Sequence, residues 1–141
     1  MKAWEVLGSS DKRKAYDQNR GVISELKSSS ITLTPDNYQY LVEESKSLWV
    51  IQVFDSTDGY SRYFAQFWEQ IIEEYNDIVK FGRIDIWHQS NMVSYIPYRF
   101  QVFPGIYIID KGYSELCNFD FERPLLSVRR CIEKHYEEYS I

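Results

Sequence analysis

The sequence predicts an α/β domain with a central mixed β-sheet and helices on both faces, and three observations favour this fold. Residues Trp49–Phe54 form a run of β-forming residues that is too short to span a membrane. A polar turn at 55–59 follows, and apolar residues then recur at helical spacing as far as Tyr75. Later, Asp110–Gly112 reads as a hairpin turn between two strand-like segments. A strand that leads directly into an amphipathic helix places its turn where open α/β sheets bind ligands.

The length and composition of the chain indicate one packed domain, and its net charge disfavours nucleic acids and anionic membranes as partners. The chain has 141 residues, of which 44% are hydrophobic and 17% aromatic, enough for a core of its own. The net charge of −5 disfavours binding to nucleic acid or to an anionic membrane surface, because both require a basic surface. We see neither an apolar run of about 20 residues nor a signal-peptide core after Met1.

The elements before the central strand are short. Residues 22–30 are interpreted as a linker, whose end at Ser28–Ser30 favours flexible coil. A short strand is expected at 31–33. Thr34 then caps a helix that has Pro35 at its first position, where the missing N–H of proline is harmless. Three apolar residues form the buried stripe of this helix: Tyr38, Leu41 and Val42.

The elements after the central helix complete the sheet. Val79–Ile86 alternates as a third strand, and a helix begins at Ser90 or Asn91 and ends near Pro97. A fourth strand at Gly105–Ile109 pairs with an antiparallel strand at Tyr113–Phe119. Pro124 opens the last helix, whose predicted core face is Leu125, Val128, Ile132, Tyr136 and Tyr139. Parallel strands joined by helices, followed by a hairpin, give a mixed sheet that is covered on both faces.

The junction Phe54–Arg62, together with the segments Val79–Asp85 and Tyr98–Gly105, resembles a thioredoxin domain of the protein disulfide isomerase type. The resemblance covers roughly residues 31–139 and implies a thioredoxin-like three-layer sandwich. The family's sequence motif at this junction is aromatic-x-x-W-C-G-H-C-K. In this chain the C-G-H-C part of the motif is Asp58, Gly59, Tyr60 and Ser61, so both redox cysteines are replaced.

These replacements remove the chemistry that the family performs. Thiol–disulfide exchange needs one thiolate to attack and a second thiol to resolve the mixed disulfide. The helix N-terminus would stabilise the carboxylate of Asp58, but a carboxylate cannot exchange a disulfide, and the alcohol of Ser61 cannot resolve one. The position of the buried acid behind the cysteines corresponds to Gln52, which does not titrate. The resemblance therefore implies a non-enzymatic, redox-inactive domain without a cofactor.

The resemblance also implies a peptide-binding groove. Thioredoxin-like domains hold the bond that corresponds to Phe103–Pro104 in cis, beside extended peptide substrates. Together with Thr57, Tyr60 and Gly105, these residues would outline a shallow groove with a free backbone edge. The alternative is an ordinary trans proline before a strand.

Other candidate residues have structural explanations. We expect Cys117 and Cys131 to be unpaired, packed thiols, with a disulfide between them as the alternative. Asp85 and His88, even with Asp58, match no spacing of metal ligands, so no metal site is expected. Trp87, in a polar loop, is the better candidate for an exposed contact.

The first 21 residues carry a second resemblance. Residues 3–21 resemble the end of a J-domain, with Lys12, Arg13, Tyr16 and Asp17 in register. A J-domain stimulates Hsp70 through a His-Pro-Asp loop, which would lie upstream of this segment. The expected organisation is therefore a J-domain remnant at 1–21, a linker at 22–30 and a thioredoxin-like domain at 31–141.

Together, the two resemblances imply a domain of a J-domain co-chaperone of the endoplasmic reticulum lumen. Its expected partners are Hsp70, through the full-length J-domain, and unfolded client polypeptides. Two alternatives remain: a spacer that binds nothing, and an oxidoreductase that uses Cys117 or Cys131. The second requires an exposed thiol with a depressed pKa, and neither cysteine is placed at a helix N-terminus.

Overall fold

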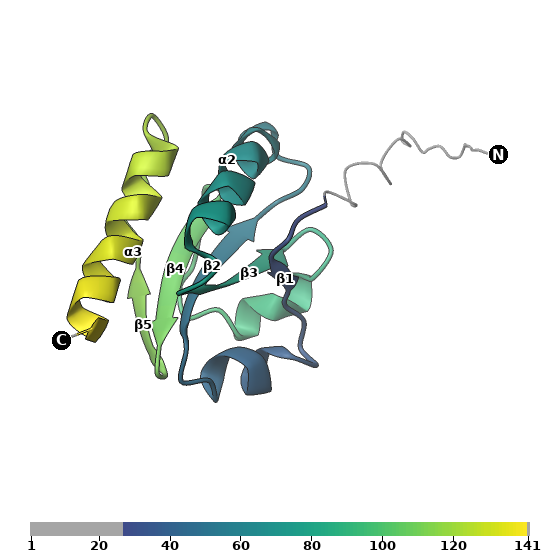
Figure 1. Ribbon diagram of the computed structural model, residues 1–141. Helices are drawn as coiled ribbons and strands as arrows, with labels where there is room; N and C mark the ends of the chain where they lie inside the picture. The colour runs from purple at the N-terminus through teal and green to yellow at the C-terminus, as the bar shows by residue number, and fades with distance from the viewer. Residues whose placement is uncertain (1–26, 141) are drawn as a thin grey trace.

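Five strands form one mixed sheet in the computed structural model, which describes the backbone of residues 27–140 and the side chains of residues 27–135 (Figure 1). The spatial order is β1-β3-β2-β4-β5, with β1, β3 and β2 parallel and β4 and β5 antiparallel to their neighbours. The strands are β1 (Ile31–Thr32), β2 (Leu48–Phe54), β3 (Lys80–Asp85), β4 (Gly105–Asp110) and β5 (Tyr113–Leu116). The predicted α/β mixed sheet is confirmed.

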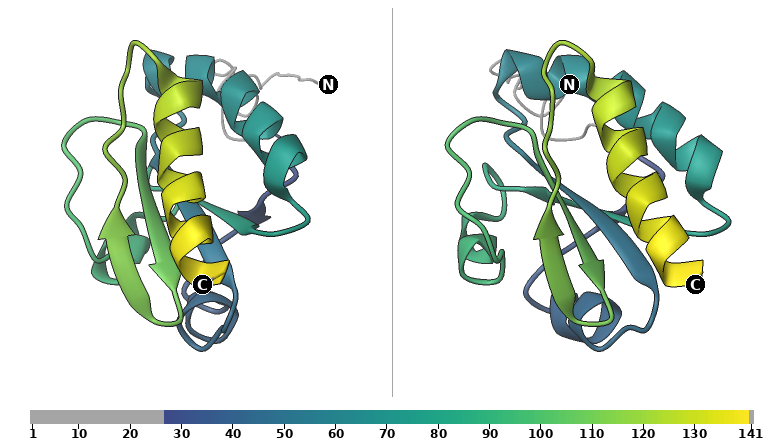
Figure 2. Two further views of the ribbon diagram at one scale, coloured as in Figure 1. Left: turned by 60° about the vertical axis from the view of Figure 1, so that its left-hand side comes forward. Right: turned by 90° about the vertical axis from the view of Figure 1, so that its left-hand side faces the viewer.

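The central strand β2 divides the core into two layers. All seven of its residues are buried, and they alternate between the two faces of the sheet. Leu48 and Val50 pack toward α2 (Gly59–Tyr75) and α3 (Pro124–Ser140), together with Trp68 and Ile108. The intervening residues pack on the opposite face, and they are Trp49, Ile51 and Val53. Figure 2 shows α2 and α3 side by side on one face, with the short helical turns on the other.

The two short helices differ from their predicted forms. Thr34 Oγ1 accepts a hydrogen bond from the N–H of Asp36 at 3.2 Å, but residues 35–37 form a turn, and the N-cap of the helix that follows is Tyr38, without a side-chain hydrogen bond. The following turn continues only as a five-residue π-helix, η1 (Gln39–Glu43). The second helix is a 3₁₀ helix, η2 (Ser90–Ser94), that ends before Pro97.

Strand β5 ends at Leu116, three residues before its predicted end at Phe119. The backbone N–H of Cys117 still donates to the carbonyl of Ile106, and the chain then leaves the sheet. It crosses over α2, where the ring of Phe119 packs edge-on against Phe64 with centroids 5.1 Å apart. Phe119 thus packs on α2 and is not part of β5, where it was expected.

Residues Ser28–Ser30 are held against α2, which differs from the flexible coil expected for the end of the linker. The backbone N–H and the hydroxyl of Ser29 donate to Glu69 Oε1 at 3.0 and 2.8 Å. The indole N–H of buried Trp68 donates to Ser30 Oγ at 3.0 Å. The J-domain-like segment at 1–21 and the rest of the linker, residues 22–26, lie outside the described residues, as do the side chains of Tyr136 and Tyr139.

Candidate functional site

The turn between β2 and α2 is shaped by short polar side chains. Asp58 is the N-cap of α2, and its Oδ2 accepts a hydrogen bond from the N–H of Ser61 at 2.8 Å. Asp55 Oδ1 accepts from both the N–H and the hydroxyl of Thr57, at 2.8 and 2.6 Å. The sequence Asp-Ser-Thr-Asp-Gly therefore folds into a tight turn that starts the helix with a carboxylate.

A second carboxylate ties this turn to the end of the neighbouring strand. Asp85, the last residue of β3, accepts from the N–H of Ser56 at 3.2 Å and lies 2.7 Å from His88 Nδ1. It also accepts from the N–H of Trp87 at 3.1 Å. Asp85 and His88 thus serve as a local brace. Trp87 is half exposed, at 50%, which confirms its predicted exposure.

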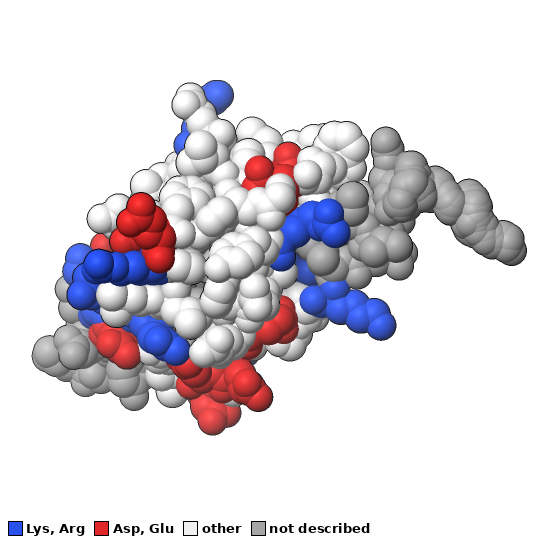
Figure 3. Space-filling model, turned by 90° about the horizontal axis from the view of Figure 1, so that it is seen from above, with Lys and Arg blue, Asp and Glu red and all other residues white. Residues whose placement is uncertain are grey.

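The Phe103–Pro104 bond is cis, as predicted, and the loop before it lies beside the start of α2. Between them is an open hollow, here called the Asp58 hollow, lined by Asp58, Tyr60, Gln101, Val102, Phe103 and Phe121. Viewed from above this end of the sheet, Figure 3 shows a broad area without charged side chains beside smaller charged groups.

Aromatic contacts fix one wall of the Asp58 hollow. The hydroxyl of Tyr60 donates to the carbonyl of Phe121, and the two rings meet edge-on with centroids 5.0 Å apart. Burial, followed by the nearby Tyr63 and Asp120, raises the pKa of Tyr60. The hydroxyl therefore stays neutral near pH 7 and keeps donating this hydrogen bond.

The structure brings together some of the predicted site residues and separates others. Asp58, Tyr60 and Phe103 line the hollow, while Thr57 and Gly59 are exposed outside its lining. Ser61 is buried, at 1% exposure, beneath the turn.

Pro104 and Gly105 are buried behind the loop. A Cβ at Gly105 would lie 2.2 Å from the ring of Phe100, so that ring covers the glycine. The sequence did not predict that Gln101, Val102 and Phe121 line the hollow. Val102 is 64% exposed, which makes it the most exposed apolar side chain of the hollow.

The side chains at the two family cysteine positions are a carboxylate and an alcohol. Gln52 is also buried, at 3% exposure, and the alternation of β2 places it on the same sheet face as Val50, beneath α2. An amide at this position cannot take up or release a proton for a thiol. The Asp58 hollow therefore presents an open, partly apolar surface and the carboxylate of Asp58, but no thiol.

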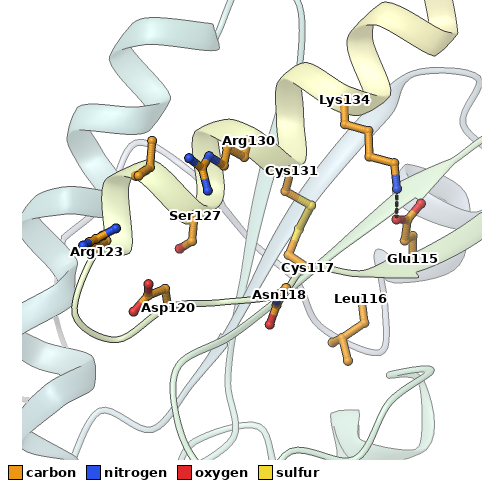
Figure 4. Close-up of a pocket in the computed structure, with 11 residues that line it drawn as sticks. Glu115, Leu116, Cys117, Asn118, Asp120, Arg123, Ser127, Arg130, Cys131 and Lys134 are labelled. Carbon is orange, nitrogen blue, oxygen red and sulfur yellow. Dashed lines mark hydrogen bonds and ion pairs between the residues drawn. A yellow bond between two sulfur atoms is a disulfide. The ribbon is translucent and has the colours of Figure 1, made fainter.

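The expectation of two free thiols is wrong, because Cys117 and Cys131 form a disulfide (Figure 4). The backbone pairing of Cys117 with Ile106 holds it at the edge of the sheet, and α3 packs back over that edge. The two Cα atoms are 5.8 Å apart, within the range that a disulfide spans. Sequence spacing carries no information on this distance, which depends on how α3 docks.

Charged groups beside the disulfide also join α3 to β5. Glu115 accepts from Lys134 Nζ at 3.2 Å and lies 2.6 Å from His135 Nε2. The hydrogen bond from Lys134, followed by that from His135, holds the pKa of Glu115 below its ordinary value. Figure 4 shows the Lys134–Glu115 pair joining the helix to the strand on one side of the disulfide, with Arg123 on the other side, toward the start of α3.

Comparisons with known proteins agree with this geometry. The thioredoxin family model matches residues 29–134. The chain belongs to the thioredoxin family. The structure resembles that of the Trx4 domain of ERdj5, with a TM-score of 0.68, 19% identity, and coverage of 79% of this chain and 99% of that one. It also resembles the J-Trx1 fragment of ERdj5, with a TM-score of 0.64, 17% identity, and coverage of 74% and 50%. At these identities the structural matches show the fold.

Two plant proteins are similar in sequence. Protein disulfide isomerase-like 2-3 from Oryza sativa subsp. japonica is 30% identical over 81 residues, which are 57% of this chain and 18% of that protein. Protein disulfide-isomerase like 2-2 from Arabidopsis thaliana is 28% identical over 107 residues, or 76% and 21%. The chain thus spans about a fifth of the length of these relatives, and the similarity supports a domain of the protein disulfide isomerase type. None of the helices in the described part of the chain combines the length and the hydrophobicity that a membrane-spanning helix needs.

Proposed function

We propose that this chain is a redox-inactive thioredoxin-like domain of a J-domain co-chaperone, and that it binds client polypeptides during Hsp70-assisted folding. The observation that carries the proposal is the position of Asp58. It lies at the start of α2 and faces Phe103 across the Asp58 hollow, where the family places its attacking cysteine. The surface for an extended peptide is kept, while the atoms that exchange disulfides are absent from these positions.

Features of the loop support peptide binding. Within the described residues, the backbone from Tyr98 to Phe103 makes no backbone–backbone hydrogen bond, so its N–H and C=O groups are free to pair with an extended chain. Val102 exposes 64% and Phe121 39% of their surfaces at the hollow. Exposed apolar side chains beside unpaired backbone suit an unfolded segment.

The setting of this activity is proposed from resemblance. One structural neighbour is the J-Trx1 fragment of ERdj5, and residues 3–21 of this chain resemble the end of a J-domain. On this basis we assign Hsp70 as the partner of the full-length J-domain and the lumen of the endoplasmic reticulum as the compartment.

Client binding can be measured directly with a fluorescent, reduced and alkylated unfolded polypeptide. The native chain should bind it with micromolar affinity, which corresponds to a binding free energy of about −8 kcal/mol. Val102→Lys places a charge on the rim of the hollow and should weaken binding about ten-fold, because an apolar contact is lost.

Ile78→Lys is the matched control. Ile78 is also an exposed apolar residue, at 45%, but it lies beyond the other end of α2. Equal weakening by both variants would indicate non-specific attraction to apolar surface. Absence of any binding would favour the spacer, the alternative in which the domain only separates its neighbours.

A further inference from the structure

A second apolar hollow opens on the other side of the loop that ends at Pro104. It has a volume of about 190 Å³, and six of its lining residues are Val53, Ile86, Val93, Ile96, Phe100 and Phe103. We call it the Val93 hollow. It is smaller than the roughly 300–1,000 Å³ of small-molecule sites, which suits a single large side chain better than a cofactor.

The two hollows are adjacent. Phe103 and Gln101 line both of them, so the loop is a wall with an apolar depression on each side. Val93, on one side, is 53% exposed, and Val102, on the other, is 64% exposed. The loop backbone between Tyr98 and Phe103 forms no backbone–backbone hydrogen bond with the part of the chain that the structure describes. A hollow thus lies on either side of the loop with which an extended chain would pair.

The charges at the two hollows are opposite. Asp58 lines one and Arg99 lines the other. Arg99 is exposed and makes no hydrogen bond or ion pair with any other residue that the structure describes. Of the two carboxylate oxygens of Asp58, Oδ2 accepts from the N–H of Ser61, and Oδ1 has no hydrogen bond from another residue that the structure describes. Each hollow can thus attract the opposite charge next to the side chain that it holds.

We propose that the Val93 hollow is a second side-chain subsite for the same client, so that the domain selects an extended segment with two large apolar side chains a few residues apart. In the preferred client segment, a basic residue flanks the apolar side chain that enters the Asp58 hollow, and an acidic residue flanks the one that enters the Val93 hollow, next to Arg99. Cysteine in the client is not required. This inference rests on the proposed function, since both subsites serve one bound peptide.

A set of fluorescent peptides on an uncharged, extended background tests the proposal. Two leucines are separated by one, two or three residues, and matched peptides replace either leucine with serine. At the best spacing, the two-leucine peptide should bind the native domain about ten-fold more tightly than either single-leucine peptide, as expected for burying most of one more side chain. A mixed Lys/Glu flank should bind several-fold more tightly than two Lys or two Glu flanks, and this difference should shrink in high salt.

Protein variants separate the two subsites. Val93→Lys changes an exposed residue in η2 and should remove the advantage of the second leucine while leaving single-leucine binding intact. Val102→Lys should weaken every peptide, and Ile78→Lys should weaken none. Circular dichroism and thermal melts establish that all three variants fold.

The outcomes distinguish failure of this inference from failure of the proposed function. If peptides bind and Val102→Lys weakens them, but the second leucine adds nothing and Val93→Lys has no effect, the second subsite is wrong while client binding stands. If no peptide binds the native domain, both are overturned. If two like charges bind as well as mixed charges at low salt, the pairing with Asp58 and Arg99 is wrong.

Discussion

Loss of the Cys117–Cys131 disulfide should lower the free energy of unfolding by about 3 kcal/mol. The two cysteines are 14 residues apart in sequence, and closing a loop of this size in the unfolded chain removes entropy worth about that amount at 25 °C. Domains of this size are typically stable by only about 5–15 kcal/mol. The double variant Cys117→Ala/Cys131→Ala should therefore stay folded but melt roughly 10 °C lower.

Urea unfolding followed by circular dichroism measures this difference, with Glu115→Gln as the matched control. That variant keeps the disulfide and removes the charge that Lys134 and His135 contact, so it should cost at most about 1 kcal/mol. Adding a reductant to the native protein should reproduce the loss, and the alanine variant should be insensitive to it. A loss below about 1 kcal/mol, or two titratable thiols in the oxidised native protein, would refute the reasoning.

Three further predictions concern single contacts. Ser30→Ala leaves the buried indole N–H of Trp68 without its acceptor, so it should cost about 1–3 kcal/mol and change the tryptophan emission spectrum, whereas an unchanged stability would show that the contact is dispensable. Asp58→Ala should cost about 1 kcal/mol in urea unfolding through loss of the α2 cap, whereas Asp58→Asn, which caps equally well, should cost little; equal costs would exclude capping as the cause. The hydrogen bond from Arg129 lowers the pKa of Glu74, so the stability from this pair is present above the ordinary glutamate pKa of about 4.3 and is lost as the pH falls through the lowered one. Arg129→Gln should remove that acid-dependent part, at most about 1 kcal/mol because the pair is exposed, and an unchanged slope of stability against pH in this range would contradict it.

The sheet could be predicted from the sequence because its signals are local. Strand β2 is an uninterrupted run of β-forming residues, and the periodic apolar face of α2 follows directly. The hairpin could also be predicted, because a glycine in a short polar segment favours a tight turn. The structure has this turn between β4 and β5, with positive φ at both Lys111 and Gly112. Each signal lies within a few residues of the element that it specifies.

The parts that could not be predicted depend on contacts between distant segments. Cys117 and Cys131 meet only because α3 docks over the edge of the sheet, and Ser29 reaches Glu69 across 40 residues of chain. The site divides in the same way. Asp58 was placed from its motif, whereas Phe121 enters the hollow because its loop folds back over Tyr60.

The most direct test of the central claim is a thiol-dependent insulin reduction assay on the native chain and on Asp58→Cys/Ser61→Cys, with unfolded-polypeptide binding measured in parallel. We predict that the native chain binds polypeptide without accelerating reduction. The double-cysteine variant should keep its binding and gain reductase activity at a slow rate, because the exchanging sulfurs are restored while Gln52 still cannot relay a proton to them. Reductase activity in the native chain that disappears on thiol blocking would contradict the account.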